Sequence, residues 1–221
     1  MSVWAIVAAG GRGDRLGLDR PKAFAALRGR PLLAESLERL DRSDWVEAIV
    51  VAAPEGWKEP TVLLAEELGC GKVSACVTGG PTRAESVTLA LAEVPEDAAV
   101  TIVHDAARPL LTDEILGRVL EPLGDGWDGA VPGLPVADTV KRVRGDAVVE
   151  TVSRDDLVAV QTPQAFVASV LRQASAGDVA GASDCAALVE RAGGRIKVVP
   201  GDPRLRKVTD ASDLELLASW L

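Results

Sequence analysis

The chain has 221 residues, of which 48% are hydrophobic and 26% are charged, and its formal net charge is −9. This composition is ordinary for a globular protein with a sizeable core, and the acidic balance disfavours a nucleic-acid-binding protein, which would present a basic surface. No apolar run approaches the ~20 residues of a membrane span, and the N-terminal residues do not resemble a signal peptide. We therefore expect a cytoplasmic protein that binds no membrane.

Cysteine and histidine usage disfavours several kinds of site. The three cysteines, Cys70, Cys76 and Cys185, are odd in number and lack the C-x-x-C spacing, which argues against a disulfide framework or a zinc site. The single histidine, His104, nearly excludes a histidine-based triad or a multi-histidine metal centre. Because His104 ends an apolar run, we interpret it as a packed residue and not as a catalyst.

The first part of the chain alternates predicted strands with predicted helices. Short apolar runs are typical of buried parallel strands, and they occur at residues 3–7, 48–52, 73–77 and 99–103. Helical spacing and a capping box indicate intervening helices, at Leu33, Leu37 and Leu40, at residues 82–91, and at Ile115, Leu116, Val119 and Leu120. This order predicts an α/β protein with right-handed βαβ units and a Rossmann-like, doubly wound, mostly parallel sheet.

The pattern changes at about Pro135. Residues 138–144 alternate polar and apolar side chains, Gly145 and Asp146 form a plausible turn, and residues 147–152 return, which predicts a β-hairpin. A lone two-stranded hairpin is marginally stable, so we expect this protruding arm, at about 136–156, to pack on a second subunit. Helices at 166–175 and 183–192, a strand at 196–199 and a helix from about Asp210 complete a single domain, 1–221.

Three loops follow predicted strands, and in doubly wound sheets ligands bind beyond the carboxyl ends of the strands. They are residues 8–22, 78–83 and 104–109. The first is rich in glycine and also carries Arg12, Arg15, Arg20 and Lys22, a combination that favours a small anionic ligand such as a phosphate. It lacks both the Gly-Lys-Ser/Thr of a P-loop and the spacing of a Rossmann fingerprint, so a glycine-rich connection with solvated arginines remains the alternative.

In the other two loops, each candidate residue has both a functional and a structural interpretation. Asp105 follows a buried strand, where a carboxylate can hold Mg²⁺ between phosphates or can cap a loop. Arg108 could bind a substrate phosphate or form an ion pair within its own loop. Gly79 and Gly80 would let a base approach the backbone, with Ser86 adding a hydroxyl, or they could form the turn into the helix that follows.

These motifs occur together in an order that resembles one family. The first loop ends in Arg15-Leu16-Gly17 and Pro21-Lys22, and further motifs follow at 79–87, 103–109, 138–142, 160–166 and 207–214. The order is similar to that of the 2-C-methyl-D-erythritol 4-phosphate cytidylyltransferases of the non-mevalonate isoprenoid pathway. The resemblance covers nearly the whole chain and implies the nucleotidyltransferase type of the doubly wound fold.

The resemblance implies an activity and a set of site residues. The activity is transfer of CMP from CTP to 2-C-methyl-D-erythritol 4-phosphate with release of pyrophosphate, aided by Mg²⁺ or another divalent cation, in a homodimer that shares its active sites through the β-arm. The implied catalytic residues are Arg15, Lys22, Arg154 and Lys207. The implied nucleotide-binding residues are Ala8, Ala9, Gly10, Gly11, Gly13, Lys22, Gly79, Gly80, Ser86 and Ala106. The implied substrate-binding residues are Asp105, Arg108, Thr139, Lys141, Arg154, Thr162 and Lys207, and Asp105 is the implied metal ligand.

The sequence departs from the family pattern in its first loop, where Arg12 and Arg15 both compete for one arginine's role, and at Ala23, Pro81 and Ala182. Three other functions stay open at this point. They are a ribitol-5-phosphate cytidylyltransferase, a sugar-1-phosphate nucleotidyltransferase that uses UTP or GTP, and a non-catalytic nucleotide-binding regulatory module. A regulatory module without catalysis would not need the cations, so the joint retention of five residues argues against it: Arg15, Lys22, Asp105, Arg154 and Lys207.

Overall fold

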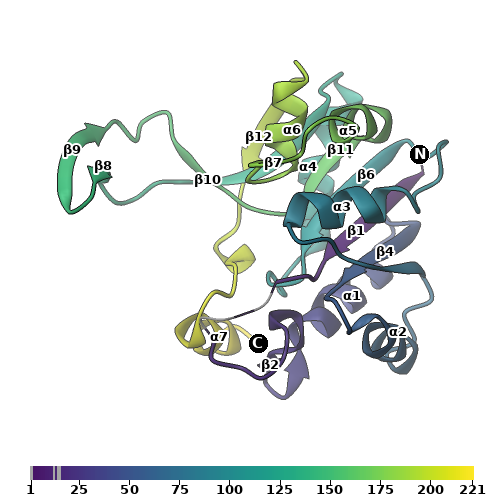
Figure 1. The fold of residues 1–221 in the computed structure, drawn as a ribbon. Helices are drawn as coiled ribbons and strands as arrows, with labels where there is room; N and C mark the ends of the chain where they lie inside the picture. The colour runs from purple at the N-terminus through teal and green to yellow at the C-terminus, as the bar shows by residue number, and fades with distance from the viewer. Residues whose placement is uncertain (1, 12, 14–15) are drawn as a thin grey trace.

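The computed structural model describes residues 2–11, 13 and 16–221, and its centre is a mixed, mostly parallel β-sheet (Figure 1). In the described residues the strands follow in the order β10 (Val158–Val160), β7 (Gly129–Pro135), β11 (Gln164–Val167), β6 (Val100–Asp105), β1 (Val3–Ala8), β4 (Ala48–Ala53) and β5 (Val73–Thr78), and β12 (Ile196–Pro200) also pairs with β7. The parallel core consists of β1 (Val3–Ala8), β4 (Ala48–Ala53), β5 (Val73–Thr78) and β6 (Val100–Asp105). The four strands predicted from apolar runs are thereby confirmed.

Helices cover both faces of the sheet, as alternating burial along the strands requires. Ala5 and Val7 of β1 join one buried cluster, whereas Ile6 joins the other. The first cluster includes residues from α1 (Leu32–Arg42), α2 (Lys58–Glu67) and α4 (Asp113–Gly124). The second includes residues from α3 (Arg83–Leu91), α5 (Ala168–Ser175) and α6 (Cys185–Arg191). The doubly wound architecture predicted from the sequence is confirmed.

Within the described residues, the second half of the chain extends the sheet with one strand that the sequence predicted, at 196–199, and with three that it did not. β7 (Gly129–Pro135) pairs in parallel with β12 (Ile196–Pro200) and antiparallel with β10 (Val158–Val160) and β11 (Gln164–Val167). The prediction of a helix over 166–175 is wrong at its start, because Phe166 belongs to β11, where it pairs with Thr101 and Gly129. Its ring is fully buried and leaves no room for a side chain at Gly129.

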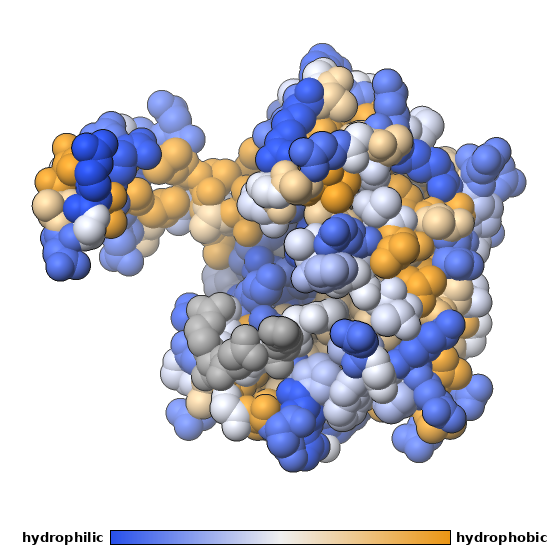
Figure 2. Space-filling model, viewed as in Figure 1, coloured by the Kyte–Doolittle hydropathy of each residue, from blue (hydrophilic) through white to orange (hydrophobic). Residues whose placement is uncertain are grey.

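A hairpin of β8 (Val140–Arg144) and β9 (Ala147–Val152) projects from the body as an arm (Figures 1 and 2). The turn lies at Gly145 and Asp146 as predicted, and Gly145 adopts a positive φ of 56°. Almost every residue of the hairpin is exposed, including Val143, Val148 and Val149. The hairpin therefore has no hydrophobic core of its own within this chain.

A smaller cluster at the C-terminal end closes the fold near the first loop. The short strands β2 (Ala26–Leu27) and β3 (Arg30–Pro31) form a separate hairpin after the 3-10 turn η2 (Lys22–Phe24). Leu27 packs with Val208 and with Leu217 of α7 (Ala211–Ala218). This cluster brings the segment that follows η3 (Pro203–Leu205) against the edge of the sheet. No helix in the described part of the chain is long and apolar enough to cross a membrane.

Candidate active site

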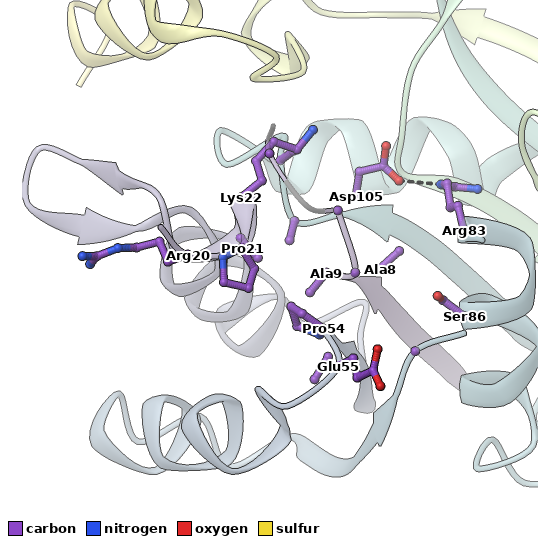
Figure 3. Close-up of a pocket in the computed structure, with 18 of the residues that line it drawn as sticks. Ala8, Ala9, Arg20, Pro21, Lys22, Pro54, Glu55, Arg83, Ser86 and Asp105 are labelled. Atoms are coloured by element: carbon purple, nitrogen blue, oxygen red, sulfur yellow. Dashed lines mark hydrogen bonds and ion pairs between the residues drawn. The ribbon is translucent and has the colours of Figure 1, made fainter. Parts of the chain in front are cut away.

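A cavity of about 1260 Å³ lies at the carboxyl ends of β1, β4, β5 and β6 (Figure 3). All three loops that the sequence placed at this edge contribute to it, together with the segment that carries Lys207 and with residues 53–55, which the sequence did not single out. Backbone hydrogen bonds continue from the strands into the loops, since the amides of Ala9 and Gly79 donate to the carbonyls of Ala52 and Ala53 at 3.0 and 2.8 Å. The lining residues are 8–11, 13, 18–23, 53–55, 78–83, 86, 105–107, 207 and 209.

The first loop folds closely around Lys22. The amide of Lys22 donates to the carbonyl of Gly11 at 3.1 Å, and Gly13 has a positive φ of 78°, which only glycine adopts without strain. A Cβ added at Gly13 would lie 3.2 Å from the backbone nitrogen of Lys22. The glycines thus permit the close approach that places the half-buried Lys22 side chain at the cavity wall. Arg15, the other cation expected here, lies outside the described residues, as does Arg12.

The second loop leads into α3 through the capping box that the sequence predicted. Thr82 Oγ1 accepts from the amide of Glu85, and the Glu85 side chain accepts from the amide of Thr82. The buried hydroxyl of Ser86 donates to the carbonyls of Thr82 and Gly80 at 2.8 and 3.2 Å. A Cβ at Gly79 would lie 2.8 Å from this hydroxyl. Ser86 therefore holds the glycine turn in shape at the cavity.

Asp105, at the end of β6, is the centre of the third loop. Its Oδ1 accepts from Arg83 Nε at 2.7 Å and its Oδ2 accepts from Lys207 Nζ at 2.6 Å. Burial alone would raise the pKa of Asp105, but the adjacent charges of Arg83 and Lys207 hold that pKa well below its usual range. Burial alone would lower the pKa of Arg83, but the charge and the hydrogen bond of the adjacent Asp105 carboxylate together raise that pKa. Asp105 and Arg83 are therefore both ionised near neutral pH.

His104 and Thr162 lie beneath this cluster. His104 is fully buried, and burial lowers its pKa to about 4, so the ring is neutral. Its Nε2 lies 3.0 Å from the carbonyl of Arg108 and must donate to it, which leaves Nδ1 to accept from Thr162 Oγ1 at 3.3 Å. The same Thr162 oxygen accepts from the amide of Asp105 at 3.0 Å. The two residues thus fix the backbone of Asp105 from below, and His104 packs as the sequence predicted.

The structure brings together most, but not all, of the residues selected from the sequence. Ala8, Ala9, Gly10, Gly11, Gly13, Lys22, Gly79, Gly80, Ser86, Asp105, Ala106 and Lys207 all line the cavity. Arg108 and Thr162 do not line it: Thr162 is buried under Asp105, and Arg108 Nη1 donates to the carbonyl of Leu205 at 2.5 Å. Thr139, Lys141 and Arg154 lie on or beside the exposed arm, where Lys141 donates to Thr151 and Arg154 to the carbonyl of Ala137.

Several lining residues were not selected from the sequence. Arg83 stood within a recognised motif, but the distance of 22 residues to Asp105 gave no sign of their pairing. Pro54 and Glu55 follow β4 and lie opposite Lys22, Asp105 and Arg83 in Figure 3. Their position directly after a predicted strand was the signal that could have identified them. Thr209, like Arg83, stood within a recognised motif, at 207–214, but was given no role.

A doubly wound sheet with a glycine-rich, cation-bearing cavity at its carboxyl edge is typical of proteins that bind nucleotides, nucleotidyltransferases among them. The family model described as 2-C-methyl-D-erythritol 4-phosphate cytidylyltransferase matches residues 3–221, and the chain belongs to that family. Its similar proteins include the enzyme of that description from Saccharopolyspora erythraea, which is 45% identical with both chains fully covered. The one from Frankia casuarinae is 44% identical over 99% of this chain and 81% of its own length.

Solved structures agree with this assignment. The crystal structure of the Francisella tularensis 2-C-methyl-D-erythritol 4-phosphate cytidylyltransferase matches with a TM-score of 0.84 and 27% identity, covering 100% of this chain and 99% of its own. That of the Thermus thermophilus enzyme matches with a TM-score of 0.78 and 32% identity, covering 97% of this chain and 96% of its own. The family expected from the order of the motifs is thereby confirmed.

Proposed function

We propose that the chain transfers the CMP group of CTP to 2-C-methyl-D-erythritol 4-phosphate, giving 4-diphosphocytidyl-2-C-methyl-D-erythritol and pyrophosphate. The observation that carries this proposal is the full-length family match together with Lys22, Asp105 and Lys207 in one cavity. A phosphate oxygen of the acceptor attacks the α-phosphorus of CTP, the new phosphorus–oxygen bond forms, and the bond to the β-phosphate oxygen breaks. The nucleophile is already an anion at neutral pH, so the reaction requires no general base.

Catalysis then consists of positioning two polyanions and stabilising the charge that develops on the α-phosphate and the leaving pyrophosphate. Lys22, which Gly11 and Gly13 approach closely, is suited to the triphosphate, and Arg15 is predicted to act beside it. The opposite side of the cavity has the narrow glycine turn held by Ser86, where the backbone of Gly79 and Gly80 can meet the base. Lys207 is suited to the incoming acceptor phosphate. Because His104 is buried and neutral, catalysis depends on the fixed cations.

A divalent cation could bind at this site only together with the phosphates of the substrate. In the described part of the chain no group of three or more His, Cys, Asp or Glu residues could hold a metal, and each oxygen of Asp105 already binds one cation. Each of these oxygens keeps a second lone pair, and Mg²⁺ is commonly held by one or two carboxylates together with substrate phosphates. Asp105 would be the protein ligand, and the bound ion would neutralise phosphate charge.

The same proposal gives the arm a function in a homodimer. Thr139, Lys141 and Arg154, which the family pattern assigns to acceptor binding, do not line the cavity of their own chain. The arm exposes Val143, Val148 and Val149, and the neighbouring strand β10 exposes Val158 and Val160. Burial of these apolar side chains against a second copy would stabilise the arm and deliver Arg154 to the partner's cavity. Lys22 and Arg154 of one active site would then belong to different chains.

Pyrophosphate release in the presence of CTP and Mg²⁺ tests the proposal, with 2-C-methyl-D-erythritol 4-phosphate and D-ribitol 5-phosphate compared as acceptors. We expect release with the first acceptor alone. Release with ribitol 5-phosphate alone would retain the chemistry and refute the acceptor. Folded protein that binds CTP but releases no pyrophosphate with either acceptor would contradict the proposed reaction.

A further inference from the structure

We infer that Arg83 is a positioning residue for the acceptor phosphate, acting through Asp105 on Lys207. This inference rests on the proposed function and deepens it, because the family pattern assigned no site role to Arg83. The arginine contributes Nε to Oδ1 of Asp105, while Lys207 takes Oδ2. Both cations line the cavity, and the carboxylate divides its two oxygens between the more buried Arg83 and the more exposed Lys207.

Exposure distinguishes the roles of the two cations. The side chain of Asp105 is 7% exposed and that of Arg83 is 23% exposed, whereas that of Lys207 is 37% exposed. Arg83 is also held from the other side, because its Nη1 contacts Cys185 Sγ at 3.7 Å. Burial raises the pKa of the Cys185 thiol, so the thiol stays neutral and does not compensate the positive charge of Arg83.

The surroundings of Arg83 do not favour an arginine for the stability of α3. Arg83 is the first residue of the helix, where the positive end of the helix dipole disfavours a cation. Its Nη2 is buried and has no hydrogen-bond partner among the described residues, which is a destabilising arrangement. The ion pair with Asp105, across the cavity edge from the helix, explains why an arginine occupies this position.

The charge of the cluster gives the arginine its effect on the substrate. Arg83, Asp105 and Lys207 together carry one positive charge in excess, because two cations share one carboxylate. Without Arg83, Asp105 and Lys207 would neutralise each other, and Asp105 would hold the ammonium group against an incoming phosphate. The lysine itself stays in place, because the adjacent Val208 amide donates to the carbonyl of Ala107 at 2.8 Å. Arg83 thus keeps Lys207 available to the phosphate.

Steady-state kinetics of R83Q and R83K tests this inference, with R172Q as a matched control. Arg172 is also a part-buried arginine, but it donates to the carbonyls of Leu91 and Val94 and does not line the cavity. For R83Q we expect the KM of the acceptor phosphate to rise by about tenfold or more, kcat to fall, and the KM of CTP to stay within about twofold. R83K should recover most of the loss, because an ammonium group can restore the charge.

R172Q should lower the melting temperature without changing the KM of either substrate. A double-mutant cycle adds a readout that a purely structural role would not give: in a D105N background, R83Q should cause no further loss of kcat/KM for the acceptor. Wild-type acceptor kinetics in R83Q, or a further loss of equal size in the D105N background, would overturn the inference. An inactive wild-type chain would instead refute the proposed function, so the two failures are distinguishable.

Discussion

Replacement of Asp105 by Asn changes the charge of the cluster while nearly preserving its shape. The amide oxygen of Asn can still accept from Arg83, but the amide nitrogen would face Lys207 Nζ, so that two donors oppose each other. Breaking a buried ion pair by removing one charge costs about 3–5 kcal/mol. Because the Lys207 side chain is 37% exposed, solvent screens its share, and we expect a loss of about 2–4 kcal/mol in the free energy of unfolding. In a chain of this size that corresponds to a melting temperature lower by roughly 4–16 °C.

The pH dependence of unfolding checks the physical origin of this loss. The folded-state pKa of Asp105 lies below its usual range, so the charged carboxylate contributes stability that is fully present above the unfolded pKa of about 4 and is lost as the pH falls below it. Urea unfolding of wild type and D105N should therefore differ most at neutral pH and converge under acid conditions. D97N, at an exposed aspartate, serves as the control and should match wild type at neutral pH. Equal stability of D105N and wild type at pH 7 would refute the reasoning.

Three further predictions concern the cavity and the arm. Lys22→Ala should lower kcat by about 10²–10³-fold, by analogy with loss of an oxyanion-hole donor, with an unchanged circular dichroism spectrum; wild-type turnover would exclude its proposed role. Gly79→Ala places a Cβ 3.2 Å from the carbonyl of Ala53 and should raise the KM of CTP about tenfold through overpacking of the turn, whereas an unchanged KM would place the base elsewhere. Arg154→Ala and Lys22→Ala, each nearly inactive alone, should regain activity when mixed as a heterodimer, and no recovery in a verified heterodimer would contradict the shared site.

Local patterns in the sequence predict the parallel half of the fold well. The mostly apolar runs of β1, β4, β5 and β6, and the capping box at Thr82, reflect interactions between residues that are close in the chain. The strand β7 was missed because its sequence, GAVPGLP, contains the glycines and prolines that usually mark loops. Helix α2 was missed because Pro60 and two glutamates near its end obscure its apolar side. These failures arise where local composition opposes the structure that long-range pairing imposes.

In the candidate site, too, local features could be predicted from the sequence and long-range contacts could not. The glycine loops were found because a close approach to the backbone leaves a local signature, as at Gly13 and Gly79. Ion pairs leave none, since Asp105 lies 22 residues from Arg83 and 102 residues from Lys207. Lys207 itself was selected only through the family resemblance. The distances that bring these charges together depend on the packing of α3 and of the C-terminal cluster, which no local window contains.

Arg108 makes a contact that the sequence did not predict, because both roles considered for it, a phosphate ligand and an ion pair, would place an anion beside it. Its guanidinium donates to the carbonyl of Leu205, two residues before Lys207, while its own carbonyl receives the Nε2 proton of His104. Two further hydrogen bonds continue this series, because Thr162 Oγ1 donates to His104 Nδ1 and accepts from the amide of Asp105. The loop after β6 is therefore tied both to the segment that carries Lys207 and to the carboxylate that pairs with it. A buried network of this kind fixes the spacing of Asp105 and Lys207 before any substrate binds, which is the condition for electrostatic stabilisation without reorganisation.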